Sequence, residues 1–239
     1  MDLVVPFCTM FISTLFGLII GKYLYIAEFK SWTEAQVHCR TFYTDLALIN
    51  SQTDQDLIIL LTPDATTEGW IGLYLVNRIR EEWMWSGAGL TTYTNWDKDQ
   101  PNYWGDKQDT VKMNGDGLWN DYAKTQMFPF YCCELIVKKD LSWERASEHC
   151  KTKGANLTEL PWDNEVSLIK NQMQREGLSL VWTGLRFLGD RWMWVSGGPL
   201  EPEKHVISQC PVNERCGALN PQGALENRNC EEKLFFVCD

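Results

Sequence analysis

The chain has 239 residues, enough for one large domain or for two domains of about 110 residues each. It carries 22 lysine and arginine residues against 32 aspartate and glutamate residues, a formal charge of -10. Phosphate binding needs a basic face, so this balance argues against a nucleic-acid partner. The 12 tryptophans predict a loop-rich fold with aromatic cores, in which most of them pack.

The first twenty residues are almost wholly apolar and are followed by Gly21 and Lys22. Three interpretations stay open for this leader: a cleaved signal peptide, an uncleaved type II membrane anchor and a buried helix. No lysine or arginine precedes Lys22, and both targeting segments would favour basic residues there. We expect residues 1–21 to be a signal peptide or an anchor. The protein would then be extracellular and secreted or, alternatively, held at the cell surface.

The cysteines indicate the same compartment. Of nine cysteines, Cys8 lies in the leader and eight follow it, and none forms a Cys-x-x-Cys pair. A zinc ribbon or a thioredoxin-type motif is therefore not indicated. Structural disulfides in an oxidising compartment are the simpler interpretation.

Four blocks of the sequence recur in the same order. They are "SWTEAQVHC" (31–39) with "SWERASEHC" (142–150), "WIGL" (70–73) with "WTGL" (182–185), "WMWSG" (83–87) with "WMWVSG" (192–197), and "FYCCE" (130–134) with "FFVCD" (235–239). Ordered self-similarity of this kind is the mark of a duplicated unit. It predicts two copies of one domain, over residues 23–134 and 135–239, with almost no linker.

The first repeated block predicts a short helix. Ser31 can cap its start, and we expect an inward face formed by four residues: Trp32, Ala35, Val37 and Cys39.

The rest of each copy predicts a second helix and several strands. Alternation predicts half-buried strands at 45–50 and 155–160, and helical spacing with acidic starts predicts helices over 54–61 and 164–173. Three further segments of copy one read as short strands between long, turn-rich loops: "WIGLYL", "EWMWS" and "PFYCCEL". Each copy is therefore expected to be a mixed α+β domain with two helices.

Together these motifs resemble the C-type lectin-like domain. The shared features are the Ser-Trp-x-x-Ala-x-x-His-Cys helix, the Trp-x-Gly-Leu and Trp-x-Trp strands and the final aromatic-x-Cys-acid. In copy one, Gln-Pro-Asn at 100–102 and Trp-Asn-Asp at 119–121 resemble the two calcium-site motifs of that family. The resemblance covers nearly the whole chain after the leader and is to secreted or membrane-linked animal C-type lectins of the mannose-receptor kind. It implies two tandem α+β domains, each with two helices, short antiparallel strands and a long loop region.

The resemblance also implies a set of disulfides. Its expected pairs are Cys39–Cys133, Cys150–Cys238 and an inner bridge, Cys216–Cys230. Copy one has Thr110 and Lys124 at the positions of the inner pair, so its loops should lack that bridge and be the more mobile.

Two cysteines, Cys132 and Cys210, have no expected partner. They could bridge the two copies, join another chain or stay reduced. Cys132 alternates away from Cys133 on a terminal strand, which favours a buried free thiol for Cys132.

In calcium-dependent members of the family, a metal and a sugar share ligands, and the proline peptide of the first motif is typically cis. Residue by residue, the resemblance assigns both roles to Gln100, Asn102, Gln108, Asn120 and Asp121. Calcium takes about six to eight oxygen ligands, amide carbonyls included, but its affinity rises with the number of anionic ligands. Only Asp121 is a carboxylate, although Asp106 and Asp109 lie nearby in sequence. We therefore expect a weak calcium site in copy one only, with a sugar ligand bound through adjacent hydroxyls.

The Gln-Pro-Asn motif leaves the sugar undecided. In this family, Glu-Pro-Asn accompanies mannose-type ligands and Gln-Pro-Asp accompanies galactose-type ligands, so the motif here is a hybrid. Stacking of a galactose face on Trp104 is one option. Alternatively, Pro101 and Trp119 preserve only the shape of the loop, and the chain is a calcium-independent module that recognises a protein.

Copy two has lost most of these ligands. Its proline motif is Cys-Pro-Val at 210–212, and the counterpart of Trp-Asn-Asp is Leu-Glu-Asn at 225–227. Glu214, Glu226 and Asn227 could be ligands by position, but three groups do not build a calcium cage. We expect copy two to be a spacer, a stabilising partner or a protein-binding surface.

An enzymatic function is not expected. The sequence has no His-Glu-x-x-His motif, no nucleophile elbow and no phosphate-binding glycine loop. Of the three histidines, His38 and His149 occupy equivalent helix positions, which indicates packing; the third is His205.

The expected partner is a glycan, a glycoprotein or another protein, with oligomerisation as a source of avidity. One glycosylation sequon begins at Asn156, which is expected to face outward.

Overall fold

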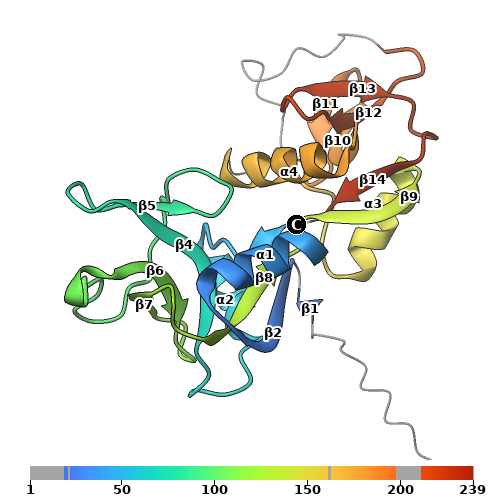
Figure 1. Cartoon of the computed structure of the whole chain (residues 1–239). Coiled ribbons are helices and arrows are strands. Elements are labelled where there is room, and N and C mark those ends of the chain that lie inside the picture. The colour runs from blue at the N-terminus through green and yellow to red at the C-terminus, as the bar shows by residue number, and fades with distance from the viewer. Residues whose placement is uncertain (1–18, 21, 161–162, 198–210, 239) are drawn as a thin grey trace, which may run out of the picture.

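The computed structural model describes residues 19–20, 22–160, 163–197 and 211–238. These residues form two α+β domains, each with one sheet and two α-helices (Figure 1). Residues 1–18 of the leader, together with His205 and Cys210, lie outside this described part. Among the described residues, no helix combines the length and the apolar character that crossing a membrane requires.

Domain 1 has the first of these sheets. Its elements are β1 (Ile19–Ile20), β2 (Tyr23–Lys30), α1 (Trp32–Phe42), β3 (Asp45–Leu46), α2 (Gln52–Ile59), β4 (Gly69–Asn77), β5 (Glu82–Trp85), the 3-10 helix η1 (Trp104–Asp106), β6 (Gln108–Met113), β7 (Trp119–Ala123) and β8 (Phe128–Cys133). The strand order is β1-β2-β8-β4-β6-β7, with β3 paired to β8 and β5 paired to β4.

Domain 2 repeats this plan with fewer strands. Its elements are β9 (Ile136–Leu141), α3 (Trp143–Thr152), α4 (Asp163–Glu176), β10 (Val181–Leu188), β11 (Arg191–Trp194), β12 (Cys216–Leu219), β13 (Leu225–Arg228) and β14 (Leu234–Val237). The order is β13-β12-β10-β14-β9, with β11 paired to β10. In each domain the first long strand pairs antiparallel with the last one, so the ends of the domain lie side by side.

Helix α1 forms where the sequence predicts it. Ser31 and Glu34 make a reciprocal capping box, which satisfies backbone N–H groups at the start of the helix. The inward face follows helical spacing through Trp32, Ala35 and Cys39, and all three are buried. The expectation for Val37 was wrong, because two residues after Ala35 a helix has turned about 200°, and Val37 is 59% exposed.

Two of the predicted strands are largely absent. In 45–50 only the first two residues form a strand, β3, and all six residues are buried, not alternately exposed. This segment contributes to two core clusters, with Leu46 in one and Leu48 in the other, so both of its sides are covered. In 155–160 a single isolated bridge joins Leu157 to Cys238. Alternation therefore overestimated strand in both segments, and in 45–50 every side chain is buried in the core.

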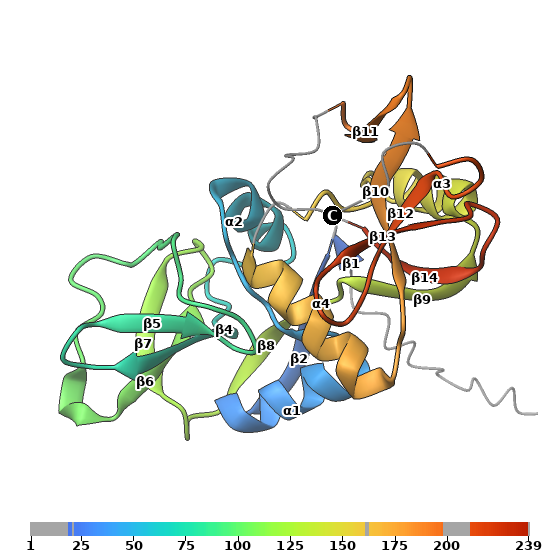
Figure 2. The ribbon, with the colours of Figure 1, turned by 90° about the horizontal axis from the view of Figure 1, so that it is seen from above.

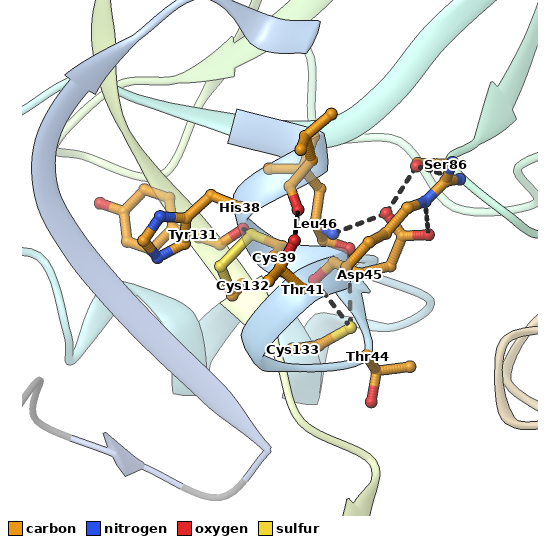
Figure 3. The surroundings of a disulfide bond; sticks show 12 residues. His38, Cys39, Thr41, Thr44, Asp45, Leu46, Ser86, Tyr131, Cys132 and Cys133 are labelled. Carbon is orange, nitrogen blue, oxygen red and sulfur yellow. Dashed lines mark hydrogen bonds and ion pairs between the residues drawn. A yellow bond between two sulfur atoms is a disulfide. The ribbon is translucent and has the colours of Figure 1, made fainter. Parts of the chain in front are cut away.

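The disulfide of domain 1 differs from the expected one. Cys39 is bonded to Cys132, with a Cα–Cα distance of 5.4 Å, and Cys133 is free and buried (Figure 3). Adjacent residues of a strand point to opposite faces, so only one of the two cysteines can reach α1. Cys132 lies in the core cluster under α1 with Cys39, whereas Cys133 lies in the cluster on the other face. The expected pair Cys39–Cys133 was therefore wrong by one residue.

The corrected pair restores the register of the repeat. In domain 2, Cys150 is bonded to Cys238 and Cys216 to Cys230, as expected. Phe130 packs under α1 and Phe236 packs under α3, each two residues before the bonded cysteine. The last repeated block thus aligns Cys132, not Cys133, with Cys238.

The histidine prediction agrees with this register. The His38 ring lies edge to face with Phe130 at 5.1 Å, and the His149 ring lies edge to face with Phe236 at 5.4 Å. Both side chains pack against the core of their own domain.

The two domains share a buried interface formed mainly by α4. Figure 2 shows α4 of domain 2 lying against domain 1, near α1 and α2. One cluster of buried side chains joins Leu168, Ile169 and Met173 of α4 with residues of domain 1 that include Ile49 and Ile58. Domain 2 therefore completes the core of domain 1.

Hydrogen bonds from α4 fix this arrangement. The Thr44 hydroxyl donates to Gln172 Oε1 at 2.6 Å, and Arg175 donates to the Thr44 carbonyl at 2.7 Å. The Asn171 side chain donates to the Gly87 carbonyl at 2.6 Å, and Gly89 N–H donates to Asn164 Oδ1 at 2.9 Å.

A buried ion pair crosses the same interface. Lys22 of domain 1 binds Glu165 of α4 and also lies 3.0 Å from Asp54 of α2. Burial alone would lower the pKa of Lys22, but the two carboxylates outweigh it and raise the pKa above its ordinary value. The charged form of Lys22 is thus part of the interface.

Candidate functional site

The segment 99–106 of domain 1 has an unusual backbone. The Gln100–Pro101 peptide is cis, and Asp99 and Tyr103 have φ values of 61° and 53° in the left-handed region. Residues other than glycine seldom adopt this conformation, and such outliers concentrate at binding and catalytic sites. The two left-handed residues therefore mark this loop as a candidate binding site.

Asp121 of β7 holds this loop. Its side chain is fully buried, and its two carboxylate oxygens accept the N–H groups of Asn102 at 3.0 Å and Tyr103 at 2.8 Å. Hydrogen bonds to a charged acceptor are the strong ones. Asp121 thus joins the Gln-Pro-Asn motif to the Trp-Asn-Asp motif directly.

Two amide side chains converge on the next residue. The Trp104 N–H donates to Asn102 Oδ1 at 3.0 Å and to Gln108 Oε1 at 2.6 Å. Both carbonyl oxygens therefore lie within hydrogen-bonding distance of one atom.

The other two predicted ligands keep open acceptors. Gln100 Oε1 is buried and has no hydrogen-bond partner among the described residues. Leaving such a group unpaired costs about 1–3 kcal/mol. Asn120, next to Asp121 on β7, is partly exposed and pairs through its backbone with Lys112.

The structure thus links Asn102, Gln108 and Asp121 into one hydrogen-bonded cluster, with Gln100 and Asn120 each within two residues of a member along the chain. Sequence reasoning missed the three consecutive backbone N–H groups that fill these acceptors, because nothing in the residue types signals them.

The neighbouring acidic residues do not belong to this hydrogen-bonded cluster. Asp109 Oδ2 is paired with Lys124 Nζ at 2.9 Å, and its buried Oδ1 has no hydrogen-bond partner among the described residues. The side chain of Asp106 lies outside the described part. In the described ranges, one group of three acidic, histidine or cysteine side chains has its ligand atoms within 4.8 Å of one another: Glu144, Cys216 and Cys230. Since the two cysteines form a disulfide, this group is no metal site. The donor set at the loop is therefore one carboxylate and four amides. Such oxygens suit calcium, at the weak end of its range.

Domain 2 has no comparable cluster at the equivalent strand. On β13, Glu226 Oε1 accepts a hydrogen bond from Asn220 at 2.8 Å, and Asn227 donates to Glu214 Oε2 at 2.7 Å. Each carboxylate has a local amide partner.

Domain 1 replaces the inner bridge with weaker contacts. Thr110 pairs with Tyr74 across the sheet, and Cys216 pairs with Arg186 at the equivalent position of domain 2. The Lys124 carbonyl accepts a hydrogen bond from Trp32 N–H, and the Cys230 carbonyl accepts the equivalent bond from Trp143 N–H. Thr110 and Lys124 therefore do occupy the cysteine positions. The Thr110 hydroxyl donates to the Tyr122 carbonyl at 2.9 Å, and Lys124 pairs with Asp109.

Comparisons with known proteins agree with this architecture. The family described as the Lectin C-type domain matches residues 28–134 and 139–239. The mouse low affinity immunoglobulin epsilon Fc receptor is 32% identical over 118 residues, covering 49% of this chain and 35% of the receptor. The rat C-type mannose receptor 2 is 32% identical over 249 residues, covering 89% of this chain and 17% of that protein. The chain spans about a third or less of the length of these curated relatives.

Among solved structures, the mouse scavenger receptor C-type lectin carbohydrate-recognition domain matches with a TM-score of 0.44 and 27% identity, covering 48% of this chain and 90% of that one.

Fold and repeat therefore define a tandem pair of lectin-like recognition domains. The chain belongs to the C-type lectin domain family, with one domain in each matched range. Domains of this class recognise carbohydrates or proteins and are not enzymes.

Proposed function

We propose that the chain is a carbohydrate-binding lectin whose sugar site lies in domain 1. The site residues are Gln100, Asn102, Gln108, Asn120 and Asp121. One observation carries the proposal: the buried Gln100 Oε1 has no hydrogen-bond partner in the described part of the chain, in a loop held by a fully buried carboxylate. A hydroxyl donor or a cation at that oxygen would remove the cost of leaving it unpaired.

Calcium would be held by the same five residues. When bound, it supplies a hard cation on which adjacent sugar hydroxyls replace water. Both Asp121 oxygens and the oxygens of Asn102 and Gln108 already accept backbone N–H groups, so binding must compete with these bonds. We therefore expect a dissociation constant toward the millimolar range of weak extracellular modules.

The residues of the chain have separate roles in this proposal. Asp121 orients Asn102 and Tyr103 and keeps the loop in its left-handed turn. Gln100 and Asn120 offer oxygen acceptors to sugar hydroxyls, and Asn102 and Gln108 supply the remaining amide oxygens of the site. The Trp104 side chain is 81% exposed beside them, so its indole offers an apolar face to a sugar ring.

The setting of the proposed lectin follows from its chemistry. Three disulfides favour an extracellular, oxidising location, with residues 1–21 as a signal peptide or an anchor. The partner would be a glycan or a glycoprotein, and oligomers would add avidity to a weak single site. Asn156 is exposed, as a glycosylated asparagine must be.

A second candidate function is calcium-independent recognition of a protein. It is favoured by the side-chain oxygens of Asp121 and Asn102 already accepting the backbone N–H groups of Asn102, Tyr103 and Trp104. In that case Asn120 would have no special importance.

The test is binding of the full chain to a glycan array in calcium and in chelator, with Asn120→Ala and Asn227→Ala as matched variants. Asn120 lies on β7 and Asn227 on β13, the equivalent strand of domain 2, where Glu226 corresponds to Asn120 and Asn227 corresponds to Asp121. The proposal predicts calcium-dependent binding that Asn120→Ala abolishes and Asn227→Ala leaves intact. Equal binding by both variants, with or without calcium, would exclude the lectin site and favour protein recognition.

A further inference from the structure

A groove on domain 1 shares no residue with the proposed sugar site. It has a volume of about 410 Å³, and its lining comes from the end of β2, from α1 and from the turn before β8. We call it the α1 groove, because six of its nine lining residues belong to that helix. No residue of α4 lines it, so it is also separate from that helix of the domain interface.

Four apolar side chains line the α1 groove, and each is between 50% and 66% exposed: Phe29, Val37, Phe42 and Met127. Together they expose on the order of 400 Å² of apolar surface, since a large aromatic side chain offers about 150–250 Å². The largest apolar patch on a typical monomer is about 300–600 Å² and often has a function. The α1 groove is therefore a candidate interaction surface.

Domain 2 shows that the fold does not require this patch. According to the repeat and the strand pairing, the equivalent residues of domain 2 are Asp140, Glu148, Lys153 and Lys233, and all four are exposed. A charged residue thus occupies each position at which domain 1 exposes one of these apolar side chains. The apolar character of the α1 groove therefore needs a reason other than the stability of the fold.

The polar side chains of the α1 groove already have partners inside domain 1. Lys30 Nζ lies 2.9 Å from Glu28 Oε2, and the Ser31 hydroxyl donates to Glu34 Oε2 at 2.6 Å. The Thr41 hydroxyl donates to a carbonyl of its own helix at 2.8 Å. A protein that covered the groove would therefore leave these groups paired, which avoids the cost of a lost hydrogen bond.

The charge of the α1 groove restricts the kind of partner. Its lining holds one lysine and one glutamate, and burial lowers the pKa of His38 below the ordinary 6.5, so the lining has no net charge at pH 7. The whole chain carries -10, so two copies repel each other where their acidic surfaces meet. At the groove two copies can meet without that repulsion, whereas a strongly charged partner would find no complement there.

The size of the patch also fits a contact between two copies. A standard interface buries about 800 Å² on each partner, and somewhat more than half of that area is apolar. The apolar surface of the α1 groove, on the order of 400 Å², would supply most of this share. A second copy presents the same neutral, apolar patch, as a twofold contact requires.

We infer that the α1 groove is the interface of a twofold dimer of this chain, with α1 of one copy packed against α1 of the other. None of the five proposed sugar ligands lines the groove, so dimerisation does not bury them in this contact. The dimer would then provide two sites for avidity. The inference does not depend on sugar binding, and its test needs no ligand.

The test is sedimentation equilibrium of the full chain from about 1 to 100 µM, which reaches the weak end for an interface of this size. Val37→Glu/Phe42→Lys introduces the residue types that domain 2 carries at these positions, so the fold should tolerate it. Val76→Glu/Ile79→Lys is the control, because it makes a matched exchange at two exposed side chains outside the groove. Neither double variant changes the net charge.

We expect the wild type and the control to dimerise, and the dissociation constant of Val37→Glu/Phe42→Lys to rise at least about tenfold. Thermal melting checks that each variant is folded. A wild type that stays monomeric over this range, or equal dimerisation by the two double variants, would overturn the inference. Binding of a monomeric wild type to phosphatidylcholine vesicles, lost in Val37→Glu/Phe42→Lys, would instead assign the groove to a lipid surface.

Oxidative cross-linking gives an independent measurement of the geometry. Val37 lies near the middle of the helical part of the groove, so two Val37→Cys side chains should lie close to the twofold axis. We expect Val37→Cys to form a covalent dimer faster than Ile79→Cys, whose side chain lies outside the groove. Equal rates for the two variants would contradict the packing of α1 against α1.

Discussion

The two domains share a fold but hold their binding loops in different ways. Domain 2 has the inner bridge Cys216–Cys230, while the polar groups of its Glu226–Asn227 segment are paired with local partners. Domain 1 lacks the bridge and instead ties its loop through the buried carboxylate of Asp121. One domain has kept the covalent support without the ligands, and the other has kept the ligand cluster without the covalent support.

This difference shows that the helix–sheet frame does not depend on the site. Trp32 and Trp143 donate to equivalent carbonyls, those of Ile71 and Thr183, at 2.9 and 2.8 Å. The disulfide Cys39–Cys132 packs in the core cluster under α1, and Cys150 packs in the cluster under α3; the cluster under α1 contains none of the proposed ligands.

The largest expected effect on stability comes from removing the disulfide Cys39–Cys132 of domain 1. Replacing Cys39 and Cys132 together by alanine should lower the free energy of unfolding by about 4–5 kcal/mol, since the bridge closes a long loop. Cys133→Ala should cost only about 1 kcal/mol. Denaturant unfolding measures both. If Cys133→Ala proved the more damaging variant, the pairing would be Cys39–Cys133 after all.

Breaking the buried ion pair between the domains should lower the free energy of unfolding by nearly as much. Lys22→Met leaves Glu165 and Asp54 buried without their cation, which should destabilise the chain by about 3–5 kcal/mol. The surface pair of Lys30 with Glu28 provides the control, and Lys30→Met should cost less than about 1 kcal/mol. Because the Lys22 pKa is raised above 10.5, its contribution is complete at neutral pH and disappears only in strong alkali. Equal effects of the two variants would mean that the domains are not coupled through this pair.

The inner bridge can be removed from one domain and added to the other. Cys216→Ala/Cys230→Ala should destabilise domain 2 by about 3 kcal/mol, and Thr110→Cys/Lys124→Cys should stabilise domain 1 by up to about the same amount. The two pairs have the same sequence separation, 14 residues. Thermal melting under oxidising and reducing conditions measures both changes. Failure of the new cysteines to pair would show that the loops of the domains differ in more than the bridge.

The smallest expected effect is a shared pH dependence. Burial lowers the pKa of both His38 and His149 below the ordinary 6.5. The folded state then binds fewer protons than the unfolded state between the lowered pKa and 6.5, so stability should fall as pH falls through that window. The melting temperature of His38→Phe should depend less on pH than that of wild type between about pH 7 and 5. If the melting temperature of His38→Phe changed with pH as steeply as that of wild type, groups other than His38 would cause the pH dependence.

Much of the fold followed from the sequence because each element repeats. The helix after Ser31 was predicted from its capping serine and its spacing, and helices over 54–61 and 164–173 were predicted from spacing and acidic starts; they correspond to α1, α2 and α4. The errors arose where a prediction depended on which face of a helix or strand a single side chain occupies. Val37 was placed on the wrong face of α1, and the adjacent pair Cys132 and Cys133 could be separated only by knowing which face of β8 meets that helix.

The site was predictable in its residue types and not in its bonding. The motifs located Asn102 and Asp121, but that Asp121 accepts two backbone N–H groups depends on the turn at Tyr103. The interface formed by α4 left no sequence signal either, since Gln172 and Asn164 read as ordinary polar helix residues.

The most direct test of the account is a calcium titration of the full chain followed by thermal melting, with Asn120→Ala and Asn227→Ala in parallel. The account predicts a melting temperature that rises over millimolar calcium, falls back with chelator and rises equally in Asn227→Ala, but not in Asn120→Ala. No shift in the wild type up to about 10 mM calcium, or an equal shift in both variants, would contradict a calcium site in domain 1.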